Sequence, residues 1–165
     1  MDYSDFLSGK RRVAPTVGRA GVSNGDIHPV LFPFQRDLVR WSVRKGRAAL
    51  FADTGLGKTL MQIEWARLLG ERTLIVAPLS VARQTVRIAH DMLGVDVHYT
   101  RNGSDLVGLL NITNYEMVEH FDPSLFGAVV LDESSILKSL DGKTRSKLCE
   151  MFADSSPPRQ GRRAD

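Results

Sequence analysis

An α/β fold, in which helices cover both faces of a parallel sheet, is the fold class that this sequence predicts. Short, continuously apolar runs alternate along the chain with stretches of helical periodicity. Runs without polar alternation are typical of parallel strands that are buried on both faces. The length of 165 residues suits one domain and excludes two complete nucleotide-binding lobes side by side.

The composition is that of an ordinary globular protein and excludes several classes. Of 22 basic and 19 acidic residues, three Arg and one Asp lie in the last eleven positions, SSPPRQGRRAD, so the rest of the chain is close to neutral. The single cysteine, Cys149, excludes an internal disulfide. No apolar run reaches the roughly 18 residues of a membrane span, and the N-terminus lacks the order of a signal peptide. We therefore expect a cytoplasmic protein with no membrane partner.

Three segments are expected: a flexible arm over residues 1–28, a lobe over 29–153 and a disordered basic tail over 154–165. The arm mixes Gly, Ser, Asp and Arg with isolated apolar residues and has no period, so it is expected to add little to the core. The tail contains two adjacent prolines and three arginines, which prevents strand or helix packing.

The lobe opens with a predicted helix that ends near Gly46, because apolar residues follow the turn-forming Pro33 at near-helical spacing. This spacing places Trp41 on the buried face. Gly70 ends a second predicted helix, and Ser80 is the expected N-cap of a third. Strands are expected at 48–52, 73–78, 95–99, 111–113 and 127–133, and the helices after the first at 58–70, 80–93 and 142–152.

The segment ADTGLGKT at 52–59 lies between a predicted strand and a predicted helix and is typical of a phosphate-binding loop. Gly55 and Gly57 let the backbone approach a phosphate without a Cβ clash, and backbone N–H groups line the anion site at the helix N-terminus. In such a loop Lys58 reaches the β and γ phosphates and the Thr59 hydroxyl binds Mg²⁺.

Two adjacent carboxylates, Asp132 and Glu133, end the predicted strand at 127–133. Ligands bind at the carboxyl ends of the strands in an open parallel sheet, so this pair is expected to face the phosphate loop. Asp132 is expected to hold Mg²⁺ directly or through water, and Glu133 to activate the water that cleaves the γ-phosphate of ATP. The expected catalytic residues are thus Lys58, Asp132 and Glu133, with Thr59 and Asp132 as ligands of Mg²⁺.

These motifs together resemble the first RecA-like lobe of superfamily 2 helicases and translocases, most of all the Swi/Snf-like branch, over about residues 30–148. That branch carries an adenine-reading segment, L-x-P-[YF]-Q with a Trp six residues after the Gln, and LFPFQRDLVRW has this form. The resemblance implies that Gln35 hydrogen-bonds the adenine edge and that Phe34 shapes the base pocket. A Gln amide offers the donor and the acceptor that adenine requires.

The phosphate loop also resembles that of the branch, D-E-x-G-L-G-K-T, except that Thr54 replaces the usual apolar residue, as in other superfamily 2 helicases. The resemblance extends the nucleotide site beyond the residues that chemistry alone indicates. Its expected members are Phe34, Gln35, Asp53, Thr54, Gly55, Leu56, Gly57, Lys58 and Thr59.

Two further segments, LIVAPLSVARQ and ITNYEMV, resemble those that contact a nucleic-acid backbone in this family. A helix N-terminus with a hydroxyl suits a phosphate contact. The implied partner is DNA, or alternatively RNA. The residues concerned are Pro78, Leu79, Ser80, Thr113, Asn114 and Tyr115.

The resemblance implies the ATP-binding lobe of a nucleic-acid-dependent ATPase, which couples Mg²⁺-ATP hydrolysis to movement on DNA in the complete protein. The family's Ser/Thr-Ala-Thr strand, its second RecA-like lobe and its arginine finger have no counterpart here after Phe152. An arginine finger contributes roughly 10³-fold or more to the rate, so this lobe by itself is expected to hydrolyse ATP weakly. The abrupt change to a run rich in Arg, Pro and Ala suggests a truncated or frame-shifted product of a longer gene, with a natural disordered tail as the alternative.

Two other functions remain open at this point. One is a non-hydrolysing ATP-binding adaptor, or a split-helicase subunit that needs a second lobe in trans. The other is a small P-loop kinase, against which the adenine-reading segment before the loop argues.

Overall fold

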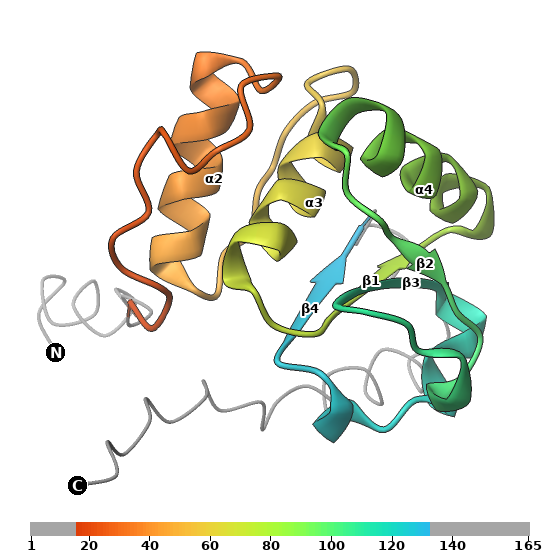
Figure 1. Cartoon of the computed structure of the whole chain (residues 1–165). Coiled ribbons are helices and arrows are strands. Elements are labelled where there is room, and N and C mark those ends of the chain that lie inside the picture. The colour runs from red at the N-terminus through yellow and green to blue at the C-terminus, as the bar shows by residue number, and fades with distance from the viewer. Residues whose placement is uncertain (1–15, 133–165) are drawn as a thin grey trace, which may run out of the picture.

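The structure, a computed structural model, describes residues 16–132 (Figure 1). Several expectations lie outside these residues: the catalytic role of Glu133, the helix at 142–152, the basic tail at 154–165 and the first half of the arm. Among residues 16–132, no helix is long and apolar enough to cross a membrane.

Four parallel strands form one sheet in the order β2-β3-β1-β4, which confirms the predicted α/β fold with a parallel sheet. Every residue of β1 and β3 is buried, as expected for parallel strands covered on both faces, and β3 buries the polar residues Asn111, Thr113 and Asn114 beside its apolar ones. In β1 alternate residues face opposite sides, so that Ile75 joins one apolar cluster and Leu74 the other. The strands are β1 (Thr73–Ala77), β2 (His98–Tyr99), β3 (Leu110–Asn114) and β4 (Ala128–Leu131).

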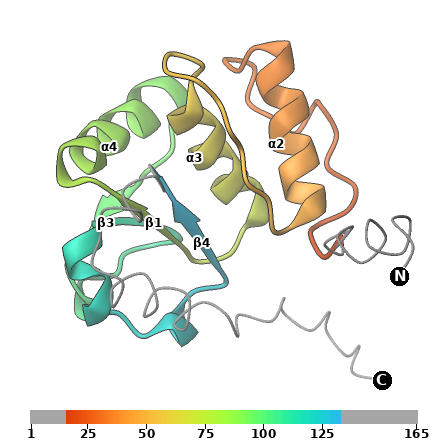
Figure 2. The ribbon, with the colours of Figure 1, turned by 180° about the vertical axis from the view of Figure 1, so that it is seen from behind.

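Three α-helices lie on one side of this sheet, and short 3₁₀ segments lie on the other (Figures 1 and 2). α3 packs between α4 and α2 (Figure 1). Phe121 and Phe126, whose rings meet edge to face with centroids 5.9 Å apart, help fill the opposite side. The helices are α2 (Pro33–Lys45), α3 (Lys58–Leu69) and α4 (Leu79–Leu93), and the 3₁₀ segments are η1 (Gly103–Asp105), η2 (Tyr115–His120) and η3 (Pro123–Leu125).

Several sequence expectations were wrong. The N-cap of the helix after β1 is Pro78, so Ser80 lies inside that helix and does not cap it. The apolar run at 48–52 is not a strand, and Phe51 is 97% exposed. Among the described residues the run pairs with none of the four strands, so it forms no ladder. Trp41 is 48% exposed rather than buried, because α2 turns Val39 and Val43, which lie on its other side, toward α3.

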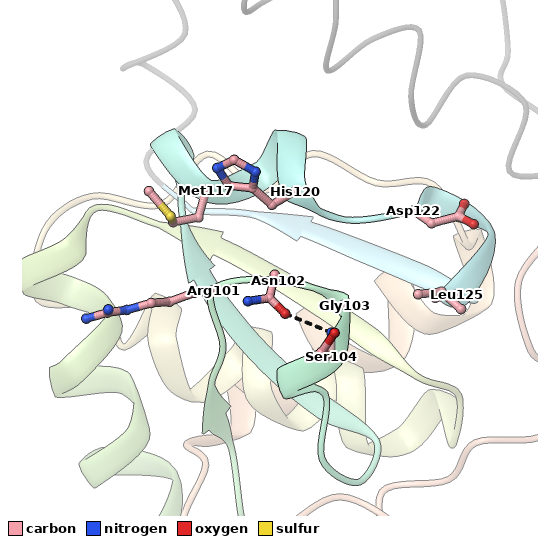
Figure 3. A pocket seen from close by; sticks show the side chains of 8 residues that line it. All are labelled: Arg101, Asn102, Gly103, Ser104, Met117, His120, Asp122 and Leu125. Atoms are coloured by element: carbon pink, nitrogen blue, oxygen red, sulfur yellow. Dashed lines mark hydrogen bonds between the residues drawn. The ribbon is translucent and has the colours of Figure 1, made fainter.

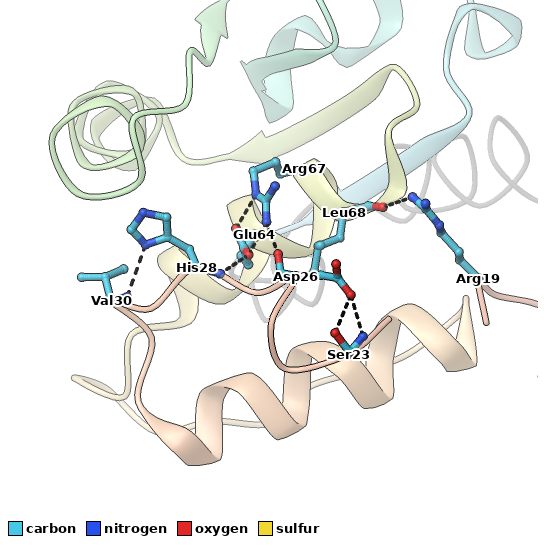
Figure 4. A network of polar contacts seen from close by, with 8 residues as sticks. All are labelled: Arg19, Ser23, Asp26, His28, Val30, Glu64, Arg67 and Leu68. Atoms are coloured by element: carbon cyan, nitrogen blue, oxygen red, sulfur yellow. Dashed lines mark hydrogen bonds and ion pairs between the residues drawn. The ribbon is translucent and has the colours of Figure 1, made fainter. Parts of the chain in front are cut away.

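The segment before α2 has no helix or strand, as expected, but it does contribute to the core, since Ile27 is only 3% exposed. A polar network ties this segment to α3 (Figure 4). Glu64, which is fully buried, accepts the backbone N–H of His28 at 2.7 Å and two hydrogen bonds from Arg67 at 2.7 and 2.8 Å. Arg67 also donates to the Asp26 carbonyl at 2.6 Å. Hydrogen bonding to the Glu64 carboxylate raises the pKa of Arg67.

Candidate nucleotide-binding site

The predicted phosphate loop lies at the N-terminus of α3, where the first backbone N–H groups of a helix have no partner within the helix. Gly57 is the N-cap with φ of +74°, and Gly55 has φ of +80°. Only glycine adopts these angles without strain. A Cβ on Gly57 would also lie 2.4 Å from Nε2 of Gln35, so this position needs glycine for a second reason.

Lys58 folds back over the loop that precedes it. Its Nζ donates to the carbonyl of Ala52 at 2.9 Å and to that of Asp53 at 3.0 Å. The Asp53 carboxylate in turn accepts the backbone N–H of Thr54 at 2.7 Å. The ammonium group is therefore bonded to the loop that precedes it, in which the sequence predicts contact with phosphate oxygens.

Gln35, the residue predicted to read adenine, links α2 to this loop. Its Oε1 accepts the backbone N–H of Phe32 at 2.8 Å, and its Nε2 donates to the Leu56 carbonyl at 2.9 Å. The side chain is 3% exposed, so both bonds are shielded from water. The two predicted parts of the nucleotide site, 21 residues apart in sequence, are thus in direct contact.

Phe34 lies beside this link with 45% of its surface exposed, and its ring stacks with that of Phe32 at a centroid distance of 6.3 Å. Phe32 is a residue that the sequence did not single out. Phe32 is 64% exposed, but this exposure depends on where α2 lies in the fold. The sequence alone therefore does not distinguish it from a residue that packs in the core.

Asp132 lies directly after β4 and is only 7% exposed. Its Oδ1 accepts a hydrogen bond from Nε2 of Gln62 on α3 at 2.8 Å, and its backbone carbonyl accepts one from the Tyr115 hydroxyl. Gln62 follows Thr59 by three residues on α3, so the two side chains share one helix face. The structure therefore brings Asp132 to the same face of α3 as Thr59.

One carboxylate and one hydroxyl suit Mg²⁺, which keeps several waters and takes most other ligands from nucleotide phosphates. Asp132 and Thr59 are the residues predicted to supply such donors. Between residues 16 and 132 no three His, Cys, Asp or Glu side chains gather into a metal-binding group. Neither Gln62 nor the inward position of Tyr115 was predicted, since a glutamine within a helix carries no motif of its own.

The two segments predicted to contact nucleic acid meet at one edge, because Ala77 of β1 lies opposite Asn114 of β3. They differ in exposure. Leu79 and Ser80 are exposed, and Pro78 is partly exposed. Thr113, Asn114 and Tyr115 are at most 6% exposed.

Asn114 accepts a hydrogen bond from the Tyr99 hydroxyl at 2.8 Å and donates one to Glu116. The side chain of Asn114 therefore bonds within the lobe. Among the described residues no partner is seen for the buried hydroxyl of Thr113.

A cavity of about 660 Å³ lies elsewhere, between the loop after β2 and the segments η2 and η3 (Figure 3). None of the residues predicted for the nucleotide site lines it. Hydrogen bonds from the hydroxyl and the backbone N–H of Ser124 lower the pKa of Asp122 at its rim. The residues that line the cavity are Arg101, Asn102, Gly103, Ser104, Met117, His120, Asp122 and Leu125.

Comparison with known proteins gives relatives in both sequence and fold, although no family model matches the chain. The chain is 34% identical over 128 residues to the SWI/SNF-related matrix-associated actin-dependent regulator of chromatin subfamily A-like protein 1 of Xenopus laevis, and equally to that of Xenopus tropicalis. Each match covers 67% of this chain, which spans only 13% of the length of either relative.

Among solved structures, the UvsW helicase from bacteriophage T4 has a similar fold, with a TM-score of 0.63 and 17% sequence identity. The similarity covers 94% of this chain and 57% of that one. The sequence relatives and the shared fold together support a Swi/Snf-like helicase lobe of superfamily 2.

Proposed function

We propose that this lobe binds Mg²⁺-ATP at the N-terminus of α3 and serves as the ATPase lobe of a protein that couples ATP hydrolysis to movement on DNA. The observation that carries the proposal is the convergence of three segments on the start of α3. Gln35 bonds to the loop at Leu56, Lys58 lies inside the loop, and Asp132 bonds to α3 through Gln62.

Each of these groups has a defined part. The first-turn N–H groups of α3 and Lys58 would hold the phosphates, and Thr59 and Asp132 would hold the Mg²⁺, which supplies charge stabilisation for phosphate cleavage. When ATP binds, Gln35 releases the Leu56 carbonyl and forms hydrogen bonds with the adenine edge instead. Glu133, next to Asp132, activates the attacking water.

DNA, or RNA in its place, is proposed to cross the strand ends at Pro78, Leu79 and Ser80, where exposed backbone begins a helix. Movement requires a second lobe, in cis or in trans, to complete the charge stabilisation around the γ-phosphate.

Replacement of Lys58 by alanine tests the nucleotide site. Loss of a charged hydrogen-bonding group costs about 1.5–3 kcal/mol, so ATP affinity in the presence of Mg²⁺ is expected to fall at least about tenfold. Isothermal titration calorimetry with ATP and Mg²⁺ measures this change directly.

Arg72→Ala is the matched control, because it removes a positive charge from an exposed side chain at the amino end of β1, away from the site. Its affinity for ATP is expected to equal that of the wild type. Full affinity in Lys58→Ala would rule out the phosphate-loop assignment. ATP binding without turnover at any DNA concentration, with turnover restored by a second lobe, would instead favour the split-subunit alternative.

A further inference from the structure

Asp132 is held at two points by residues from two different elements. Gln62 of α3 donates to its carboxylate at 2.8 Å, and Tyr115 of η2 donates its hydroxyl to the backbone carbonyl of the same residue. Tyr115 is 5% exposed and Asp132 is 7% exposed, so water has little access to the groups that form these bonds.

These two bonds restrict different motions. The backbone N–H of Asp132 still bonds to the Val76 carbonyl at 2.8 Å, but β4 itself ends at Leu131. Tyr115 satisfies the carbonyl beyond the end of the strand, which holds the backbone in place. Gln62 restricts the rotation of the carboxylate about its χ angles, which otherwise takes several orientations.

We propose that Tyr115 and Gln62 are positioning residues that hold Asp132 in the orientation in which it receives the Mg²⁺ of bound ATP. This inference rests on the proposed function. Tyr115 resembles a nucleic-acid-contacting residue, but its hydroxyl points inward to Asp132. The inference therefore assigns Tyr115 to the support of the metal ligand and not to the nucleic-acid contact. Since Tyr115 follows the last residue of β3, the end of that strand is tied to the metal-binding end of β4.

The test measures how ATP affinity depends on Mg²⁺ concentration in three variants of the full chain. Tyr115→Phe removes one hydroxyl, and Gln62→Met keeps the side-chain length without a donor. Tyr99→Phe is the matched control, because it removes a tyrosine hydroxyl that bonds to Asn114 and not to Asp132. Thermal melting of each variant checks the fold, and titration with ATP in EDTA reports binding without the metal.

We expect Tyr115→Phe to raise the Mg²⁺ concentration that gives half of the maximal gain in ATP affinity about three- to tenfold, the ratio that corresponds to one neutral hydrogen bond. Gln62→Met is expected to raise it about tenfold or more, because Gln62 donates to a carboxylate. ATP affinity in EDTA is expected to stay at the wild-type value, and Tyr99→Phe to keep the wild-type Mg²⁺ dependence. If Tyr115→Phe does not fold, the partly exposed Gln62 still decides the matter through Gln62→Met.

Wild-type Mg²⁺ dependence in both variants, with a shift in Asp132→Asn, would overturn this inference while leaving the proposed function intact. A change in nucleic-acid affinity in Tyr115→Phe, without a change in Mg²⁺ dependence, would overturn it as well and assign Tyr115 to the nucleic-acid contact. If the ATP affinity of the wild-type protein did not depend on Mg²⁺ concentration, the proposed function would be overturned, and this inference with it.

Discussion

Replacement of Arg67 by methionine is expected to lower the free energy of unfolding by about 3 kcal/mol, because it leaves a buried carboxylate without its counter-ion. The Glu64 side chain has no exposed surface, and its remaining bond is to the His28 backbone. The side chain of Arg67 is 38% exposed, which places the expected loss at the low end of the range for broken buried pairs. Urea unfolding followed by circular dichroism measures the change.

Arg40→Met is the matched control, since Arg40 pairs with Asp37 at the same spacing, but the two side chains are 43% and 62% exposed. Its loss is expected to stay below about 1 kcal/mol. The double variant Glu64→Leu, Arg67→Met is expected to be more stable than Arg67→Met alone, because no unpaired charge is buried. Equal losses in Arg67→Met and Arg40→Met would show that burial of Glu64 does not govern the strength of this pair.

Replacement of Gly57 by alanine is expected to weaken ATP binding about 30- to 150-fold, since the backbone strain and the displacement of the Gln35 amide, which is proposed to bind adenine, together cost about 2–3 kcal/mol. At φ of +74° an alanine is strained, and its Cβ would lie 2.4 Å from Nε2 of Gln35. Gln35 must then leave the Leu56 carbonyl, or the loop must leave its present shape. In the first case the Gln35 amide is pushed away from the place where it is proposed to bind adenine, and in the second ATP binding has to restore the strained loop, so affinity falls either way.

Two other glycines allow the effect of backbone strain to be separated from the effect of contact with Gln35. Gly55→Ala, at φ of +80° with no atom within 4 Å of its Cβ, carries the strain alone and is expected to weaken binding about tenfold. Gly94→Ala, at φ of +59° after α4, carries the same strain away from the site. It is expected to lower stability while ATP affinity, measured by calorimetry, stays unchanged. Equal affinities in Gly57→Ala and Gly55→Ala would mean that the approach of Gln35 to the loop has no effect on binding.

Local pattern was sufficient for those elements whose formation depends on their own residues. The apolar runs of β1 and β4 and the helix that begins at Lys58 could be read directly, because backbone preference and side-chain period act over a few residues. Glycines with positive φ at 55 and 57 follow from the same local rule.

Packing decided the features that depend on distant neighbours. The run at 48–52 is as apolar as β4 but is not a strand, because a strand forms only where its backbone pairs with a neighbouring strand, and this run pairs with none of the described strands. Trp41 is exposed because α2 presents its other side to α3, whereas Ile27 is buried because Glu64 and Arg67 hold its segment against that helix.

The candidate site divides in the same way. The loop at Lys58 and the carboxylate of Asp132 belong to motifs that a few adjacent residues define. The bonds that join them, from Gln35 to Leu56 and from Gln62 and Tyr115 to Asp132, connect residues 17 to 70 positions apart. Such contacts exist only once the elements have packed, because a side chain reaches across a few ångströms and the sequence does not record which distant group will lie within that reach.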